Sequence, residues 1–296
     1  MTHPRVTVFG GTGFLGRRLV ERLAHAGSEV IVAARHAGEV AVPEDASGTV
    51  VFRRADVRNA DDVAAALEGA DAAVNAVSLY IERGGLTFED IHVEAATRIA
   101  RQTADADIRL VHVSGLGVDV DSDSAYVRAR AAGENAVRQA HPDAVVIRPS
   151  VLFGPDDAFA SSLRMLARLP VVPLFGHGDT RLQPVHVDDV AEGVARLLER
   201  GMTGATVELG GHGVHRYREL VQAALDAAGR HPPLVPVPFA LWRALSTLLS
   251  ILPNPPLTRD QVILLEKDNI VGEGAKTFAT LGIEPKDLLR VLTQRR

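Results

Sequence analysis

The sequence predicts an α/β protein with a doubly wound parallel sheet and a smaller, mostly helical C-terminal lobe. Short apolar runs alternate with amphipathic helical patterns through residues 1–150, an order that indicates βαβ units. The apolar runs are continuous rather than alternating, which is typical of strands buried on both faces. After Pro149 helical patterns dominate, so the fold is expected to change character there.

The elements of the first half follow from hydrophobic periodicity and from capping residues. Leu15, Leu19 and Leu23 share one face of the first helix, and Gly27 stands where a C-terminal cap belongs. Asn59 is a good N-cap for the second helix. The predicted strands are Arg5–Phe9, Glu29–Ala34, Val50–Arg54, Asp71–Val77, Ile108–Ser114 and Ala144–Arg148. The predicted helices are Phe14–Ala26, Ala60–Glu68, Phe88–Ala104 and Ala125–Ala140.

The second half is expected to form the smaller lobe, over residues 151–296. Residues from about 181 to 210 are expected to return to the first domain through short strands near Arg181–His186 and Thr206–Leu209. Two acids precede the apolar helix Val190–Leu198, so Asp188 or Asp189 is predicted to be its N-cap.

A proline-rich region later in the lobe carries an apolar stripe. Its periodicity favours packing inside the lobe, and a membrane-surface or partner-docking face is the alternative. The stripe consists of Leu241, Trp242, Leu245, Leu248 and Leu249.

Composition narrows the class of protein. The 296 residues include 32 Lys and Arg, 37 Asp and Glu and no Cys, giving a net charge of −5. Without Cys there is no disulfide framework, no thiol nucleophile and no Cys-based zinc site, and no metal site is predicted. The sequence has no basic stripe of the kind that would indicate a nucleic-acid partner. The N-terminus lacks the apolar region of a secretory signal, and no apolar run is long enough for a membrane span. The expected location is the cytoplasm, with peripheral contact at the inner face of the membrane left open.

A glycine-rich turn joins the first predicted strand to the first helix. It fits both G-x-G-x-x-G and G-x-x-G-x-x-G, with the required strand before it and helix after it. Such a turn lets the backbone approach a pyrophosphate, and the helix N-terminus offers N–H groups to the phosphates. Residues 1–150 are therefore predicted to be a Rossmann-type NAD(P)-binding domain. The binding residues expected here are Gly10, Thr12, Gly13, Phe14, Leu15 and Gly16.

The ends of the second and third strands indicate which dinucleotide binds. NAD sites usually carry a carboxylate after the second strand, but this chain has Arg35 there. A guanidinium can pair with a 2′-phosphate, so NADP(H) is preferred and NAD(H) is the alternative. Asp56 and Val57 follow the third strand and are expected to bracket the adenine, although Asp56 could equally be an ordinary loop carboxylate.

These motifs together resemble the extended and atypical short-chain dehydrogenase/reductases, a superfamily that includes NAD-dependent epimerases and dehydratases. Three segments further resemble the branch containing the NADPH-binding accessory subunit of respiratory complex I: Val113–Gly117, Ser124–Glu134, and Leu257–Val262 with Asp268-Asn269. The wider resemblance rests on Gly10–Gly16, Asp56-Val57, Asn75–Val77, Tyr126-x-x-x-Arg130, Arg148–Pro155 and His186–Ala191.

The resemblance implies roles for several residues. Ala76, Val77, Ser150 and Val151 are expected to line the cofactor, with the last two near the nicotinamide. Catalytic members use a Tyr as the proton donor or acceptor, a Lys four residues later, and a Ser or Thr at the end of the preceding strand. Tyr126 and Ser114 stand at two of these positions, but the Lys is replaced by Arg130.

The replacement leaves two main functions open. A guanidinium one turn from the Tyr still supplies charge, but it cannot act as a compact ammonium that binds two ribose hydroxyls. We therefore favour a weakly catalytic or non-catalytic NADP(H)-binding subunit that contacts a respiratory complex or another protein through its C-terminal lobe. The alternative is an active oxidoreductase or epimerase acting on a small carbonyl, quinone or nucleotide-sugar. A redox-sensing regulator has no positive support in the sequence.

Overall fold

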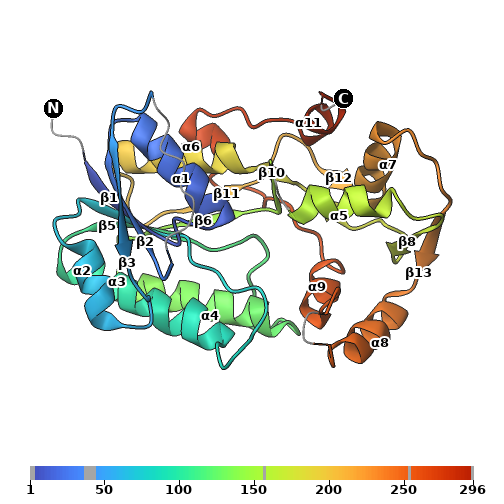
Figure 1. The fold of residues 1–296 in the computed structure, drawn as a ribbon, viewed down its shortest axis with the longest axis horizontal. Helices are drawn as coiled ribbons and strands as arrows, with labels where there is room; N and C mark the ends of the chain where they lie inside the picture. Colours follow the sequence, from blue (N-terminus) through green and yellow to red (C-terminus); the bar gives the residue numbers. More distant parts are fainter. Residues whose placement is uncertain (1–3, 37–44, 156–157, 253–254, 295–296) are drawn as a thin grey trace.

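The computed structural model describes residues 4–36, 45–155, 158–252 and 255–294. The first three residues, which the expectation about a secretory signal includes, lie outside the described residues. Its centre is a seven-stranded sheet with the order β11-β6-β5-β4-β1-β2-β3 (Figure 1). Every pairing in this sheet is parallel. The strands are β1 (Arg5–Phe9), β2 (Glu29–Ala34), β3 (Thr49–Arg54), β4 (Ala72–Asn75), β5 (Arg109–Val113), β6 (Val145–Pro149) and β11 (Thr206–Leu209).

Helices cover both faces of the sheet, as the continuous apolar strands require. In Figure 1, α1 and α6 lie above the sheet and α2, α3 and α4 lie below it. Each face has its own buried apolar core. These helices are α1 (Phe14–His25), α2 (Ala60–Leu67), α3 (Ala96–Asp105), α4 (Ala125–Ala140) and α6 (Val187–Glu199). The predicted Rossmann-type doubly wound fold is confirmed.

The strand order locates the ligand crevice. The chain runs outward from β1 to β2 and β3, and then crosses the sheet to β4. The order therefore reverses between β1 and β4, and open α/β sheets bind ligands at the carboxyl ends of the strands on either side of such a switch.

One predicted helix takes a different form. The residues from Phe88 to Ala104 were expected to be a continuous α-helix, but Glu89–Ala95 form a π-helix (η1) that leads into α3. Its wider turn brings the carbonyl of His92 against α4 at Gly133, where a Cβ would lie 1.7 Å from that oxygen. Wide turns of this kind are frequent near functional sites, and this one positions His92.

The lobe is mostly helical and is placed to the right of the sheet in Figure 1. Its third apolar cluster lies mainly between α5, α7 and the β8–β13 pair. The remaining elements are β7 (Leu152–Phe153), α5 (Ala158–Leu166), β8 (Val172–Phe175), β9 (Arg181–Leu182), β10 (Val185–His186), β12 (His215–Arg216), α7 (Tyr217–Ala227), β13 (Leu234–Val237), α8 (Phe239–Leu249), α9 (Arg259–Leu264), α10 (Phe278–Leu281) and α11 (Leu288–Gln294).

The segment around 181–210 connects lobe and sheet. β11 joins the main sheet beside β6, and α6 packs on α1. The strand expected over 181–186 is instead two short strands, because β9 pairs with β12 whereas β10 pairs with β7. On the outer side of β11, the N–H of Glu208 donates to the carbonyl of Lys276 at 2.8 Å.

The predicted cap of α6 is wrong. The helix begins at Val187, and the N-cap is His186, whose Nδ1 accepts from the N–H of Asp188 at 3.2 Å. Asp188 and Asp189 lie in the first turn, where carboxylates interact favourably with the helix dipole. Both also contact Lys286.

The expected burial of the apolar stripe is also wrong for most of its members. Trp242 does pack inward, stacking on Phe175 and donating its indole N–H to the Leu174 carbonyl. Leu241, Leu245 and Leu248 are exposed on α8, Leu248 by 65%. The helix buries only the face that carries Trp242, which packs on β8. The face that carries Leu241, Leu245 and Leu248 has no neighbouring element to cover it among the described residues. Among the described helices, none combines the length and apolar character needed to cross a bilayer.

Candidate functional site

The glycine turn forms a cradle at the carboxyl end of β1. Gly10 has a φ of +77°, and a Cβ on it would lie 2.9 Å from the Ala76 carbonyl oxygen. A Cβ on Gly16 would lie 2.0 Å from the Gly10 oxygen. Glycine is therefore required at both positions, which keeps the turn tight and brings Ala76 and Val77 directly beside it. The structure thus brings these predicted cofactor residues together.

The start of α1 is open to a ligand. The N-cap is Gly13, which is exposed and has no side chain to accept the first N–H groups of the helix. A Cβ on Gly13 would meet only the Gly10 carbonyl oxygen, at 3.2 Å. A helix N-terminus without a side-chain cap offers N–H groups and positive dipole charge, the features that bind phosphate. The residues present therefore fit a pyrophosphate.

A cavity of about 530 Å³ lies beside this cradle, at the carboxyl ends of β2 and β3. Its lining is cationic, because three arginines face two aspartates, and in the part of the chain that the structure describes no carboxylate hydrogen-bonds Arg35 or Arg54. The lining residues are Arg35, His36, Arg54, Asp56, Arg58 and Asp62. This is the end of the crevice where a dinucleotide places its adenosine ribose.

The carboxylate of Asp56 is already engaged. Arg58 donates to both of its oxygens, at 2.6 to 3.2 Å, and lowers the pKa of Asp56 to about 2. The Asp56 backbone N–H donates to Asp62 at 2.8 Å. Asp56 therefore stays ionised and fixed in place by Arg58. Arg35 is close enough to interact with its charge, but no hydrogen bond between Arg35 and Asp56 is formed. Val57 is buried beside it.

The predicted pair of Tyr126 and Arg130 is formed on α4. Arg130 donates to the Tyr126 hydroxyl at 3.0 Å and to the hydroxyl of Ser78 at 3.1 Å. Ser78 follows β4 and also hydrogen-bonds Tyr126. Burial raises the pKa of Tyr126 above its usual value, although the charge of Arg130 opposes the shift. The guanidinium therefore bridges two hydroxyls but does not make the phenol more acidic than usual.

Aromatic rings and a neutral histidine surround Tyr126. The Tyr80 ring stacks on the Tyr126 ring, with centroids 5.7 Å apart. Phe88 and His92 each form a T-shaped contact with the Tyr126 ring. Burial, together with the nearby charge of Arg130, lowers the pKa of His92 to about 4. His92 is thus neutral near pH 7 and hydrogen-bonds the Leu79 carbonyl.

Ser114 is not brought to this pair. It is only 2% exposed, and among the described residues its hydroxyl has no hydrogen-bond partner. The hydroxyl does lie close enough to the Glu134 carboxylate to help lower the pKa of that group, which binds Arg138 and Arg148. Position 115 faces the site instead, because a Cβ on Gly115 would lie 3.6 Å from the Arg130 guanidinium. The alternation of side chains around the end of β5 therefore places a glycine where a substrate-binding hydroxyl was expected.

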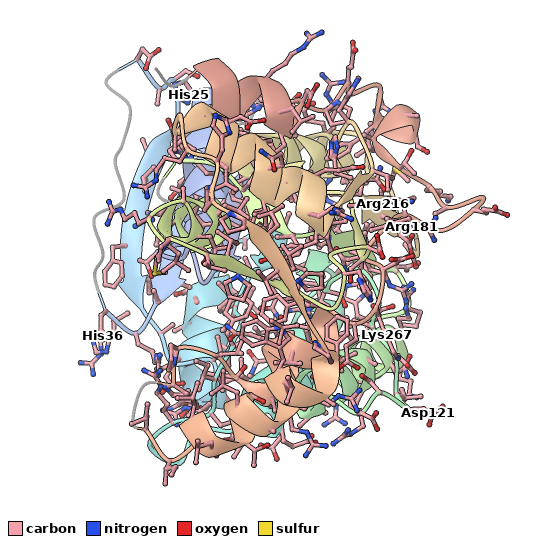
Figure 2. The ribbon with its side chains drawn as sticks, turned by 90° about the vertical axis from the view of Figure 1, so that its right-hand side faces the viewer. His25, His36, Asp121, Arg181, Arg216 and Lys267 are labelled. Atoms are coloured by element: carbon pink, nitrogen blue, oxygen red, sulfur yellow. The ribbon has the colours of Figure 1, made fainter. Side chains whose placement is uncertain are left out.

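Ser150 and Val151, expected near the nicotinamide, are both bonded to Asn269. The Ser150 hydroxyl donates to the Asn269 side-chain oxygen at 2.6 Å, and the Val151 N–H donates to it at 3.3 Å. Figure 2 shows Lys267, close to Asn269 in sequence, on the opposite side of the molecule from His36 of the cationic cavity. Lys267 therefore lies away from the cavity end of the crevice.

Sequence reasoning missed four residues that the structure brings to the crevice: Arg54, Ser78, Gly115 and Asn269. The signal for Arg54 was available, since it ends the strand next to the one that Arg35 follows. Ser78 directly follows a quoted motif, and Asn269 lay in a segment noted only for its resemblance. Among the described residues, no group of three or more His, Asp or Glu is placed to hold a metal ion.

The fold and the glycine cradle define a dinucleotide-binding protein of the Rossmann type. Comparison with known proteins then identifies the family within this class. The model of the NAD dependent epimerase/dehydratase family matches residues 6–210, and the chain belongs to that family.

Named relatives of the chain include a mitochondrial NADH dehydrogenase subunit and a reductase. The chain is 34% identical, over 95% of its length and 74% of the relative, to "NADH dehydrogenase [ubiquinone] 1 alpha subcomplex subunit 9, mitochondrial" of Arabidopsis thaliana. It is 30% identical to the ceramide reductase of Caulobacter vibrioides, over 79% of this chain and 73% of the relative. In fold it is similar to an NADPH-dependent quinone oxidoreductase of Escherichia coli in complex with NADPH, with a TM-score of 0.78, 18% identity and coverage of 98% and 99%.

Proposed function

We propose that this protein binds NADP(H) in preference to NAD(H), retains it with little or no turnover, and serves as an accessory subunit of a respiratory complex or a similar assembly. The observation that carries the cofactor preference is the cationic cavity at the ends of β2 and β3. Arg35 and Arg54 line it without a hydrogen-bonded carboxylate among the described residues. A 2′-phosphate on the adenosine ribose would supply the missing negative charge.

Weak or absent catalysis is supported by the other end of the crevice. The ammonium expected one turn after Tyr126 is a guanidinium that is also bound to Ser78. The pKa of Tyr126 is raised by burial, which disfavours the phenolate. Ser114 faces Glu134 rather than the phenol. Each of these features works against proton transfer to or from a substrate oxygen.

A partner contact is supported by α8. Leu241, Leu245 and Leu248 are exposed on one face, and Ile251 beyond the helix is 80% exposed. Between residues 232 and 258 the only charged residue is Arg243, which pairs with Glu266. Contiguous exposed apolar side chains of this kind mark interaction sites. A protein named as a subunit of NADH dehydrogenase is among the relatives, so a respiratory complex is the partner that we propose.

Titration calorimetry with NADPH and NADH tests the cofactor preference. A charge-assisted contact contributes about 1.5–3 kcal/mol, so Arg35→Ala should weaken NADPH about ten-fold or more and leave NADH unchanged. Arg54→Ala should act in the same direction. The matched control is Arg53→Ala, because Arg53 bonds the Ala65 carbonyl and lies near Glu68, outside the cavity lining. Equal affinities of the parent for both cofactors would contradict the proposal.

The assembly and location are tested together. Native mass spectrometry of the protein purified from its own host would show the bound nucleotide and any partner subunit in one measurement. We propose a cytoplasmic protein with peripheral contact at the inner face of the membrane. Replacing Leu241 and Leu248 by Ser should release the partner without affecting nucleotide binding, because both side chains are exposed and neither belongs to the cavity lining.

A second candidate is an active NADPH-dependent reductase of a small carbonyl or quinone. It is favoured by the contact of 3.0 Å between Arg130 and the Tyr126 hydroxyl and by the likeness to a ceramide reductase. NADPH oxidation across a panel of carbonyls and quinones separates the two proposals.

A further inference from the structure

The segment that follows α9 crosses the carboxyl ends of β5 and β6. Its backbone is held along β9, because the Asn269 N–H donates to the Arg181 carbonyl at 2.8 Å and the Asn269 carbonyl accepts from the N–H of Gln183 at 3.0 Å. Asp268 pairs with Arg181 at 2.7 Å, and the Val271 N–H donates to the Gln183 side chain at 3.0 Å. The side chain of Asn269 is consequently presented to the end of the sheet in a fixed position.

The carboxamide of Asn269 satisfies three groups of the sheet ends at once. Its oxygen accepts from the Ser150 hydroxyl at 2.6 Å and from the Val151 N–H at 3.3 Å. Its nitrogen donates to the Leu116 carbonyl at 3.3 Å. Two donors beside one acceptor form a seat that is complementary to a primary carboxamide, which has one acceptor oxygen and one donor nitrogen.

A nicotinamide ring carries the same chemical group. A dinucleotide with its ribose phosphate at the cationic cavity and its pyrophosphate over the glycine turn extends toward β4, β5 and β6, since these strands follow β1 in the sheet. The seat lies at the ends of β5 and β6. The cofactor carboxamide and the Asn269 carboxamide would therefore compete for the same hydrogen bonds.

We propose that Asn269 is an internal mimic of the nicotinamide carboxamide, seated in a carboxamide subsite formed by Ser150, Val151 and Leu116. While Asn269 is seated, the nicotinamide ring is held out of the site, and the cofactor is bound through its adenosine 2′-phosphate and pyrophosphate. The inference rests on the proposed binding of NADP(H). It also gives a further reason for low turnover, because the reactive carbon of the ring is kept away from Tyr126.

The experiment compares NADPH with 2′-phospho-ADP-ribose, which has every part of the cofactor except the nicotinamide ring. Calorimetry on the parent should give affinities within about three-fold of each other. Asn269→Ala empties the seat and frees at least two neutral hydrogen-bonding positions, so NADPH should bind about ten-fold more tightly than in the parent. The affinity for 2′-phospho-ADP-ribose should not change.

The matched control is Asn269→Asp. Its carboxylate still accepts from Ser150 and Val151 but cannot donate to the Leu116 carbonyl, so the seat stays filled and NADPH should show no gain. If 2′-phospho-ADP-ribose fails to bind the parent, the proposed cofactor site itself is wrong. If it binds, but Asn269→Ala shows no gain for NADPH, the inference about Asn269 alone is overturned.

A measurement on the parent decides the case if the alanine variant does not fold. NADPH fluoresces through its nicotinamide ring, and a ring held out in solvent should keep the emission maximum of free NADPH. A blue-shifted maximum for NADPH bound to the parent would show a ring docked in a dry site, and would overturn the inference.

Discussion

The two ends of the crevice satisfy their polar groups in opposite ways. At the ends of β2 and β3, Arg35 and Arg54 line an open cavity, and the part of the chain that the structure describes offers them no hydrogen-bonded carboxylate. Arg130 of α4 bridges Tyr126 and Ser78, which follows β4, and Asn269 bridges Leu116 and Ser150 at the ends of β5 and β6. The first end is prepared for a charged ligand, whereas the second has closed its hydrogen bonds within the protein. In the proposed function, the first end binds the cofactor while the second end carries out little or no chemistry.

The largest effect should come from the turn between the two ends. Gly13→Val places a branched side chain at the N-terminus of α1, in the path of the pyrophosphate, so we expect cofactor binding to be lost. The backbone of Gly13 is extended, with a φ of −76°, so the variant should remain folded. Calorimetry and circular dichroism check the two parts. Gly13→Ala is the graded control, and unchanged NADPH affinity in Gly13→Val would remove the turn from the site.

The closed end should make the protein sensitive to acid. Burial lowers the pKa of His92 to about 4 and that of His112 to about 3, against 6.5 in the unfolded chain. As the pH falls below 6.5, these two histidines become protonated in the unfolded chain but stay neutral in the folded protein. The free energy of unfolding therefore falls until the pH approaches 4. Between pH 6.5 and 5 each histidine should lower the free energy of unfolding by about 1.6 kcal/mol.

Urea unfolding at these two pH values measures that loss. His92→Gln, which can still donate to the Leu79 carbonyl, should lose roughly half as much stability as the parent over the same range. A free energy of unfolding that is flat from pH 6.5 to 5 would show that the histidines are not held neutral.

The smallest expected effect concerns catalysis. Arg130→Lys restores the ammonium one turn after Tyr126, and general acid–base assistance is typically worth about 10²–10⁴-fold. We expect less than about ten-fold rescue of NADPH oxidation, because Ser114 remains turned toward Glu134. Arg130→Lys combined with Gly115→Ser is the sharper comparison, since position 115 faces the guanidinium. Turnover by the parent that disappears in Tyr126→Phe would restore the reductase hypothesis.

The fold and the phosphate cradle could be predicted because their signals are local. Each strand is a short apolar run, and the cradle is a contiguous glycine motif between a strand and a helix. The pairing of Tyr126 with Arg130 was likewise set by a spacing of one helical turn. Their predicted roles in the site stay predictions until tested.

The features that could not be predicted depend mainly on contacts between segments that are distant in the sequence. Asn269 meets Ser150 only because the segment after α9 folds back along β9, and no periodicity indicates that path. The orientation of Ser114 depends on where β5 ends, and a shift of one residue there exchanges the faces of neighbouring side chains. The cap of α6 was misplaced because an imidazole accepted the N–H for which a carboxylate was expected.

The contact between β11 and Lys276 can form only late in synthesis of the chain, which affects folding on the ribosome. β11 is an edge strand, and its Glu208 N–H is paired only by a residue synthesised much later. The carboxylate of Glu208 pairs with Arg148, and its second oxygen accepts from the N–H of Gly272, which is also synthesised later. Until then a nascent chain presents an uncovered strand edge, which can pair with another copy. Chains that stop before Gly272 would keep that edge permanently, so premature termination should yield aggregates rather than a smaller soluble protein.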